Sequence, residues 1–301
     1  MTLLEHTPVA AAALLVETRT ETAASLSIKI GAITQQLATM ALATPLHFSA
    51  DAAESAALWS VRKGIFPAVG AVRVTGTTVI IEDVAFPVEH LAAAMMDLQR
   101  LLQQHGYTEA VVFGHALAGN LHFVFTQDFG RAAEVERYSR LMEAVCALVV
   151  DTYDGSLKAE HGTGRNMAPF VEREWGTQAY ALMQRIKALL DPQGLLNPGV
   201  ILNADPQAHL KNLKPLPVAD PLIDKCIECG FCEPKCPSRG LTLSPRQRIV
   251  GWREIARLDA AQEPGAQMKQ LFDYHGIETC AACGLCAMRN PPWFPWPGCV
   301  R

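Results

Sequence analysis

Two histidines lie where the sequence predicts two neighbouring strands. His115 and His122 belong to the stretch Phe113–Phe123. Residues 109–113 and 120–126 are rich in β-branched and aromatic side chains, which indicates a strand on either side of a glycine-containing loop. A loop of that length can fold back, so we expect the two imidazoles to come together.

A carboxylate near these imidazoles would complete a metal site. Side chains two residues apart share one face of a strand, so His122 is expected to face the same way as Asn120 and Val124. Glu160 is the best carboxylate candidate because it precedes His161 in a glycine-rich turn. Two imidazoles and one carboxylate form a site for a divalent cation such as zinc, with one coordination position open. Spacing alone leaves a second interpretation, in which these histidines only make hydrogen bonds.

The Gly-His…Gly-Asn-x-His run, followed by Glu-His-Gly, resembles FAD-linked 2-hydroxy-acid dehydrogenases of the D-2-hydroxyglutarate and D-lactate type. The resemblance implies that His115, His122 and Glu160 bind zinc and that His161 is the catalytic base. Ala118 stands where many members of the family have an aspartate, which makes the loop less acidic but removes none of the matched ligands.

An arginine near the end of a predicted helix is a candidate for substrate binding. Trp59 and Arg62 match a Trp-x-x-Arg of the same family, whose guanidinium clamps the substrate carboxylate. A planar fork of donors suits a carboxylate, although a single arginine at a helix end is commonly only solvated. The family also has a lysine beside the aspartate of a later strand, and residues 80–83 contain none. Arg73 or Arg165 could replace it, which leaves the exact substrate open.

The segment Asp191–Gly199 is rich in proline and glycine and is typical of a helix end, a turn and the entry to a strand. In the resembled family an Asp-Pro…Leu-Asn-Pro-Gly segment closes this domain and lies near the flavin ring. The resemblance therefore implies that Asn197 is a flavin-side, cofactor-binding contact.

Eight of the nine cysteines are crowded after residue 225 at short spacings, which indicates a metal cluster rather than disulfides. The first run, Cys-x-x-Cys-x-x-Cys-x-x-x-Cys-Pro, matches the bacterial ferredoxin signature for a 4Fe–4S cluster and fits a zinc knuckle poorly. Its cysteines are Cys226, Cys229, Cys232 and Cys236.

A second cysteine run is incomplete, because Asn290 stands in the place of its fourth cysteine. In two-cluster ferredoxins the fourth cysteine of each motif ligates the other motif's cluster. Cys236 would then complete the second cluster, whereas the first would lack one thiolate unless Cys299 supplies it. We therefore expect the first cluster to be the more labile. The cysteines of the second run are Cys280, Cys283 and Cys286.

These residues need a framework that brings them together. The pattern of short β-branched segments and amphipathic segments predicts an α+β domain with a mainly antiparallel sheet covered by helices. Asp51 is expected to cap a helix. The predicted strands are 11–17, 45–49, 77–81, 109–113 and 120–126, and the predicted helices are 21–40, 51–61, 131–150, 179–190 and one between Pro87 and Gly106.

We expect four parts along the chain. The resemblance implies that residues 1–203 are an FAD-linked oxidase C-terminal (cap) domain that binds substrate and metal. Residues 204–224 are predicted to be a linker, and residues 225–290 a small helical ferredoxin-like 4Fe–4S domain. The tail, residues 291–301, is rich in proline and tryptophan, which suits neither a helix nor a central strand and suggests a truncated or frame-shifted end.

The composition argues against several other classes. A net charge of −4 gives no indication of nucleic-acid binding. The apolar run at residues 9–16 is too short to cross a membrane, and Glu5 precedes it where a secretory signal has Lys or Arg. We therefore expect a cytoplasmic protein without a transmembrane segment.

Nothing in the sequence resembles the FAD-binding domain that precedes the cap domain in the family. We expect part of a flavin-dependent oxidoreductase that oxidises a D-2-hydroxy acid, D-2-hydroxyglutarate or D-lactate, to the 2-oxo acid and passes electrons through 4Fe–4S clusters. The implied partners are the hydroxy acid, an FAD-binding domain or subunit, and an electron acceptor. Two alternatives remain open: a non-catalytic iron–sulfur electron-transfer subunit, and an inactive fragment.

Overall fold

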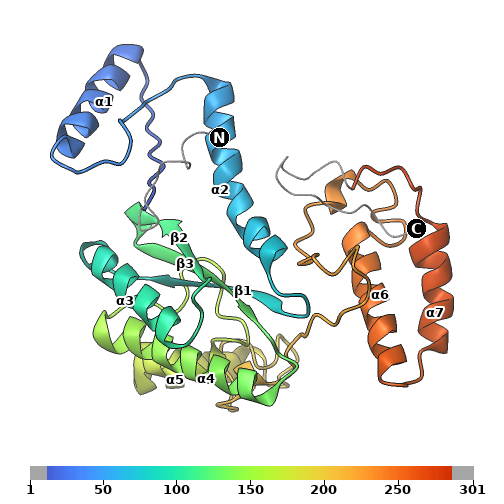
Figure 1. Ribbon diagram of the computed structural model, residues 1–301. Coiled ribbons are helices and arrows are strands. Elements are labelled where there is room, and N and C mark those ends of the chain that lie inside the picture. The colour runs from blue at the N-terminus through green and yellow to red at the C-terminus, as the bar shows by residue number, and fades with distance from the viewer. Residues whose placement is uncertain (1–11, 287–301) are drawn as a thin grey trace. The chain divides into compact units, whose positions relative to one another are not determined.

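The computed structural model describes residues 12–286 of the chain (Figure 1). The chain divides into two compact units, Met1–Ile65 and Phe66–Arg301. The helices are α1 (Ala23–Leu37), α2 (Ala52–Val72), α3 (Leu91–Gln104), α4 (Ala132–Cys146), α5 (Val171–Leu190), α6 (Pro245–Ala260) and α7 (Ala266–Phe272). The strands are β1 (Thr78–Ala85), β2 (Val111–His115) and β3 (Asn120–Gln127).

Helices α1 and α2 begin at residues whose side chains cap them. The hydroxyl of Thr22 accepts the amide of Ser25, which forms a capping box at the start of α1. The predicted cap at Asp51 is confirmed, since its Oδ1 accepts the amides of Ala53 and Glu54, each at 2.8 Å.

Two predicted strands and one predicted helix in the first part of the chain differ from the structure. The described residues of segments 11–17 and 45–49 are not strands, because they pair with no other strand that would satisfy their backbone groups. Helix α2 does not end near Val61 but continues to Val72. Its last turn is stabilised by Arg73, whose Nη1 donates to the carbonyl of Gly70 at 2.9 Å and so satisfies an otherwise unpaired helix-end acceptor.

The second unit is built on a three-stranded sheet in the order β1-β3-β2. Both strand pairs are antiparallel, which confirms the predicted sheet. The register places His122 of the central strand opposite Asp83 of β1 and Phe113 of β2. An acidic residue of the first strand is therefore a direct neighbour of the second predicted metal ligand.

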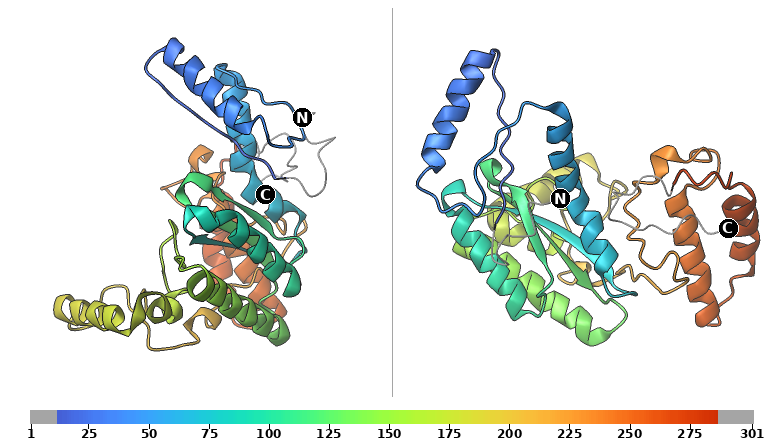
Figure 2. Two further views of the ribbon diagram at one scale, coloured as in Figure 1. Left: turned by 90° about the vertical axis from the view of Figure 1, so that its left-hand side faces the viewer. Right: turned by 45° about the horizontal axis from the view of Figure 1, so that its top comes forward.

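Helices α3 and α4 cover one face of this sheet (Figures 1 and 2). Leu121, Phe123 and Phe125, alternate residues of β3, belong to the core between the sheet and the helices. Because side chains alternate along a strand, His122 faces away from this core, as the sequence predicted. The helices contribute Ala94, Leu98, Leu102, Leu141, Met142 and Val145.

The helices around the sheet follow the predictions in part. Helix α3 lies between Pro87 and Gly106, as predicted, and Gly106 has a φ of 79° that ends the helical path. Helix α4 continues as a π-helix over Ala147–Thr152. Helix α5 begins at Val171 rather than at residue 179, because a left-handed residue, Gly176 with φ 76°, kinks it and interrupts the periodicity of its first turns.

The residues that follow the predicted linker are helical, as expected, in α6 and α7. The predicted linker itself is packed: Thr78 Oγ1 donates to the carbonyl of Lys214 at 2.8 Å, and the buried ring of His209 lies 5.0 Å from that of Phe170. The proposed domain boundaries stay a prediction. Of the helices in the described part of the chain, none is long and apolar enough to cross a bilayer.

Candidate functional site

A tight connection between β2 and β3 brings the two predicted histidine ligands together. The rings of His115 and His122 lie 5.6 Å apart, measured between centroids. Gly119, with φ 66°, ends the short turn between them, and a Cβ there would lie 2.0 Å from the carbonyl oxygen of Phe86. A Cβ at Gly114 would lie equally close to a backbone carbonyl oxygen, at 2.0 Å. The two glycines are therefore the residues that permit this close return of the chain.

Glu160 reaches both histidines. Its Oε1 lies 2.8 Å from Nε2 of His122 and 3.5 Å from Nε2 of His115. One ligand atom from each of the three residues lies within 4.8 Å of the others. The side chain of His122 is only 4% exposed, whereas those of His115 and Glu160 are 53% and 50% exposed, so the group opens toward solvent on one side.

Asp83 positions the turn that carries Glu160 and His161. Its Oδ2 accepts the backbone amides of Ala159, Glu160 and His161 at 3.1, 2.6 and 3.1 Å. Burial opposes the ionisation of Asp83, but the amides of Glu160 and His161 and the ammonium of Lys158 hold its pKa below the usual range. A buried anion thus gathers three backbone donors beside the histidines.

His161 stacks on His122, with ring centroids 4.8 Å apart and an interplanar angle of 18°. Its Nδ1 lies 3.5 Å from Oδ1 of Asp83. Asp83, His122 and His161 form a second group with metal-ligand spacing. We favour His115, His122 and Glu160 as the ligand set because Asp83 already accepts three amides and pairs with a lysine.

An open depression of about 530 Å³ adjoins His161 and is also lined by Lys158, Arg165 and Asn166. Lys158 forms an ion pair with Glu82 and lies 3.4 Å from Oδ1 of Asp83. Asn166 Nδ2 donates to the other oxygen of Glu82 at 2.6 Å.

The positioning role of Asp83 and the place of Lys158 were missed in the sequence. The one available signal was the acidic pair Glu82-Asp83 at the end of a β-branched strand. Residues 80–83 contain no lysine, but Lys158, which precedes Glu160 in the chain, contacts Glu82 and Asp83 of the same strand.

The other predicted substrate and flavin residues have different surroundings. Arg165 lines the depression and donates to the carbonyl of Pro198 at 3.1 Å, which brings the turn of Asn197 close to it. Arg73 is wrong as a candidate for the second carboxylate, because its guanidinium donates to backbone carbonyls of residues 224–226. Arg62 is a half-buried residue of α2 within the first unit.

The histidine group fits a divalent cation by its chemistry. Burial lowers the pKa of His122, and repulsion from His161 adds to this effect, whereas attraction by Glu160 opposes it. The ring is therefore neutral, and its nitrogen is free to ligate. Nδ1 of His122 is buried without a hydrogen-bond partner in the described part of the chain. Two imidazoles and a carboxylate are a donor set that suits zinc.

The two cysteine runs share two left-handed backbone positions. In the first, Glu228 and Gly230 have φ values of 61° and 81°, and in the second, Ala282 and Gly284 have 48° and 71°. These residues occupy equivalent places, one before and one after the second cysteine of each run. Left-handed conformation is rare for residues other than glycine, so its repetition indicates two loops shaped for the same purpose.

The thiols and their neighbours fit iron–sulfur ligation. Burial raises the pKa of Cys226 to about 11 and that of Cys232 to about 12, so these thiols are neutral unless a metal displaces the protons. Arg248 Nη1 lies 3.8 Å from Sγ of Cys236, and its Nη2 is buried without a partner among the described residues. A buried cation with a spare donor beside a cysteine suits an anionic cluster.

The segment after Cys236 lies beside the second cysteine run. Ser238 Oγ donates to the carbonyl of Thr279 at 2.8 Å, and Thr242 Oγ1 is also 2.8 Å from Oγ1 of Thr279, the residue before Cys280. This neighbourhood supports crossed ligation, with Cys236 on the second cluster. Cys283 and Cys229 are exposed, Cys286 is buried, and the predicted roles of Asn290 and Cys299 fall outside the described residues.

Comparisons with known proteins agree with both parts. Residues 4–201 match the family described as FAD linked oxidases, C-terminal domain, and residues 222–289 match the 4Fe-4S dicluster domain. The glycolate oxidase subunit GlcD of Escherichia coli is 32% identical over 157 residues, which cover 52% of this chain and 30% of that protein.

Two D-2-hydroxyglutarate dehydrogenases are similar to the same extent. The mitochondrial enzyme of Danio rerio is 31% identical over 189 residues, covering 62% of this chain and 33% of that protein. The Pantoea ananatis enzyme is 32% identical over 207 residues, which cover 60% of this chain and 20% of that protein. The chain thus spans about a third or less of the length of these relatives. The oxidase match is followed by the match to the 4Fe-4S dicluster domain. Because the oxidase match covers more than half of the residues of this chain, the chain belongs to the family of FAD-linked oxidases, C-terminal domain.

Proposed function

We propose that this chain is the substrate-binding and electron-exit part of a flavin-dependent dehydrogenase that oxidises a D-2-hydroxy acid to the 2-oxo acid. D-2-hydroxyglutarate and D-lactate are the proposed substrates. The observation that carries the proposal is the convergence of His115, His122 and Glu160, with His161 stacked beside them at an open depression. A protein that only carried electrons would have no use for such a group.

The residues at the histidine group have separate roles in this proposal. Zinc or a similar divalent cation on His115, His122 and Glu160 would supply Lewis-acid polarisation of the substrate's α-hydroxyl. His161 takes the hydroxyl proton at Nε2, because its Nδ1 faces Asp83 Oδ1 at 3.5 Å. The buried carboxylate of Asp83 keeps the ring oriented and stabilises the imidazolium that results.

The remaining roles concern the substrate's carboxylates and the flavin. FAD, held mainly by a domain outside this chain, would accept the hydride from C2. Arg165 suits a second substrate carboxylate because it lines the same depression as His161. Arg62 stays the proposed clamp for the first carboxylate, and Asn197 the proposed flavin-side contact, on the family resemblance alone. The clusters on the two cysteine runs would pass electrons to an acceptor.

An exposed apolar row on α5 is the surface that we propose for contact with a large protein partner. Leu182, Ile186 and Leu189 are 52%, 50% and 79% exposed and recur at a spacing that places them on one face of the helix. Because the chain spans a third or less of its relatives, an FAD-binding domain or subunit is the partner that we propose for this row. The cytoplasmic location stays a prediction.

The proposal is tested with the chain combined with an FAD-binding partner. Anaerobic addition of D-2-hydroxyglutarate or D-lactate should bleach the flavin absorbance, and His161→Gln should slow the bleaching strongly. His105→Gln at the end of α3 is the matched control and should bleach at the normal rate. Equal rates for both variants would contradict the role of His161.

The main rival is a non-catalytic iron–sulfur subunit. It predicts that no 2-hydroxy acid bleaches the flavin although dithionite still reduces the clusters. A further test uses the chain purified without a partner, which should carry little or no FAD. A stoichiometric flavin spectrum from the isolated chain would contradict the assignment of FAD binding to another domain.

A further inference from the structure

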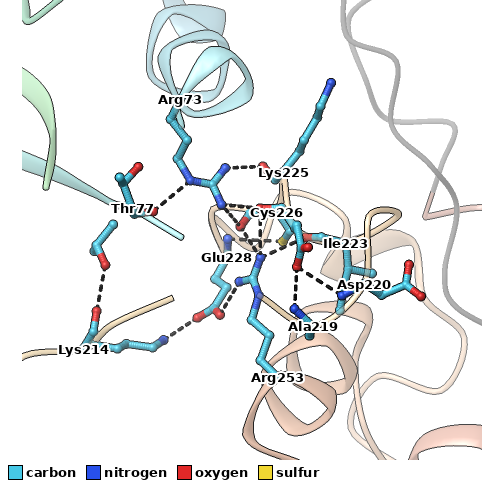
Figure 3. A network of polar contacts seen from close by, with 12 residues as sticks. Arg73, Thr77, Lys214, Ala219, Asp220, Ile223, Lys225, Cys226, Glu228 and Arg253 are labelled. Carbon is cyan, nitrogen blue, oxygen red and sulfur yellow. Dashed lines mark hydrogen bonds and ion pairs between the residues drawn. The ribbon is translucent and has the colours of Figure 1, made fainter. Parts of the chain in front are cut away.

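Arg73, which follows α2, is bonded to the backbone of the first cysteine run, residues 226–236 (Figure 3). Its Nη1 donates to the carbonyl of Lys225 at 2.8 Å, and its Nη2 donates to the carbonyls of Asp224 and Cys226, the latter at 3.2 Å. The same guanidinium donates through Nε to the carbonyl of Thr77 at 3.0 Å, immediately before β1. One side chain thus ties the start of β1 to the first cluster ligand.

A second arginine converges on the same carbonyls from α6. Arg253 is 3% exposed, and its Nη2 donates to the carbonyls of Ile223 and Cys226, both at 2.8 Å (Figure 3). Its Nη1 pairs with Oε1 of Glu228 at 2.7 Å. Glu228 in turn donates its backbone amide to Sγ of Cys226 at 3.3 Å. The carbonyl of Cys226 therefore accepts from two guanidinium groups.

Two guanidinium groups share this network with two carboxylates. Arg73 and Arg253 stand against Glu228 and Asp224, whereas Lys214, which pairs with Glu228, is 65% exposed. Nε of Arg253 is also buried without a hydrogen-bond partner in the described part of the chain. Two guanidinium groups so close together repel each other, and a further anion nearby would offset that repulsion. An iron–sulfur cluster on thiolates is such an anion.

The contact is also built sterically. A Cβ at Gly70, in the last turn of α2, would lie 2.3 Å from Cγ2 of Ile227, the residue after Cys226. Only glycine allows the helix end to approach the first cysteine run this closely. Steric fit at Ile227 and hydrogen bonding up to Cys226 therefore bring the end of α2 to adjoining residues of the loop.

We propose that Arg73 is a positioning residue for the cluster of the first cysteine run, which it ties to β1 and, together with Arg253, makes easier to reduce. The inference rests on the proposed function only in assigning a 4Fe–4S cluster to this run. Positive charge beside a cluster favours the form with one more electron, so it raises the reduction potential. Strand β1 also carries Asp83, so the same strand leads from the histidine group to the cluster loop.

The test compares Arg73→Lys with Arg73→Gln in the full chain, reconstituted anaerobically with iron and sulfide. Reduction potentials are measured by dithionite titration followed by electron spin resonance, without FAD or substrate. The signal of the first cluster is the one that Cys229→Ala abolishes. Arg100→Met, which removes a surface arginine paired with Asp97, is the matched control.

We expect Arg73→Gln to lower the potential of the first cluster and leave that of the second unchanged, whereas Arg73→Lys, which keeps the charge, stays near the wild-type value. Equal potentials in all chains, or an equal decrease in both variants, would overturn the proposal. If Arg73→Gln loses the first cluster, Arg73→Lys decides: a retained cluster at the wild-type potential supports the charge effect, and its loss overturns it. Because no substrate is used, failure of hydroxy-acid oxidation would leave this result standing.

Discussion

The histidine group and the first cysteine run are organised by side chains of opposite charge. Beside the histidines, the carboxylate of Asp83 accepts three backbone amides. Beside the cysteines, the guanidinium groups of Arg73 and Arg253 donate to backbone carbonyls of residues 223–226. The organising charge is in each case opposite to that of the proposed guest, a divalent cation or an anionic cluster. The division is not complete, because Asp224 also accepts two backbone amides.

The two regions differ in how far their ligands are assembled. Among the described residues, the groups with metal-ligand spacing are two sets that share His122, and both lie at the sheet. The cysteine sulfurs form no such set within the same part of the chain. Strand pairing places the histidines before any metal arrives, whereas the cysteine runs depend on loops, and a cluster must supply the remaining order.

The largest effect expected from this difference is the response to iron removal. In the full chain without iron, the amides of α6 should exchange with solvent about 100-fold faster or more, because binding free energy of a structural metal is folding free energy. The amides of β3 should exchange at their usual rate, since their protection comes from the sheet and its core. Hydrogen-exchange mass spectrometry with and without reconstituted iron measures both. Unchanged protection in α6 would contradict the claim that the cysteine runs depend on a cluster for their order.

A smaller effect is expected for the carboxylate beside the histidines. Asp83→Asn removes the anion that gathers the amides of Glu160 and His161, so zinc affinity should fall about 10- to 100-fold. A competition titration against a chromophoric chelator measures the change. Asp128→Asn is the control, because Asp128 accepts the amide of Gly130 in a turn outside the histidine group. Equal affinity of the two variants would show that Asp83 does not position the ligands.

The smallest effect concerns Asp191, which accepts the amides of Leu195 and Leu196, each at 2.9 Å, in the turn before Asn197. Its hydrogen bond with Lys187, followed by that with Leu196, lowers the pKa of Asp191 to about 2. A carboxyl with a depressed pKa stabilises the fold above its unfolded pKa of about 3.9 and loses that contribution as pH falls toward the folded value.

Asp191→Asn should therefore lower the melting temperature slightly at pH 7. The difference from the wild type should shrink below about pH 4 and vanish only below about pH 2, where the carboxyl is protonated in both the folded and the unfolded protein. Thermal unfolding followed by circular dichroism over this range measures it. A difference that stays constant with pH would mean that the charge of Asp191 is not what stabilises the turn.

The sequence by itself identified the candidate ligand residues, because each of them belongs to a local pattern. The alternation along 120–126 predicted that His122 faces away from Phe123, and the cysteine spacing predicted the 4Fe–4S family match. The caps at Asp51 and Gly106 were readable for the same reason. The prediction of strands at 11–17 and 45–49 was wrong, because a strand requires a pairing partner that a local pattern does not reveal.

Only the tertiary structure decided which distant residues serve these ligands. Asp83 lies beside His122 through the register of β1 with β3, and Lys158 reaches Asp83 from a separate turn. Arg73, considered for a substrate carboxylate in the sequence, instead contacts the carbonyl of Cys226. These contacts join residues far apart in the chain, and no local spacing encodes them. They depend on the path of the backbone, which strand register, helix length and close glycine contacts set together.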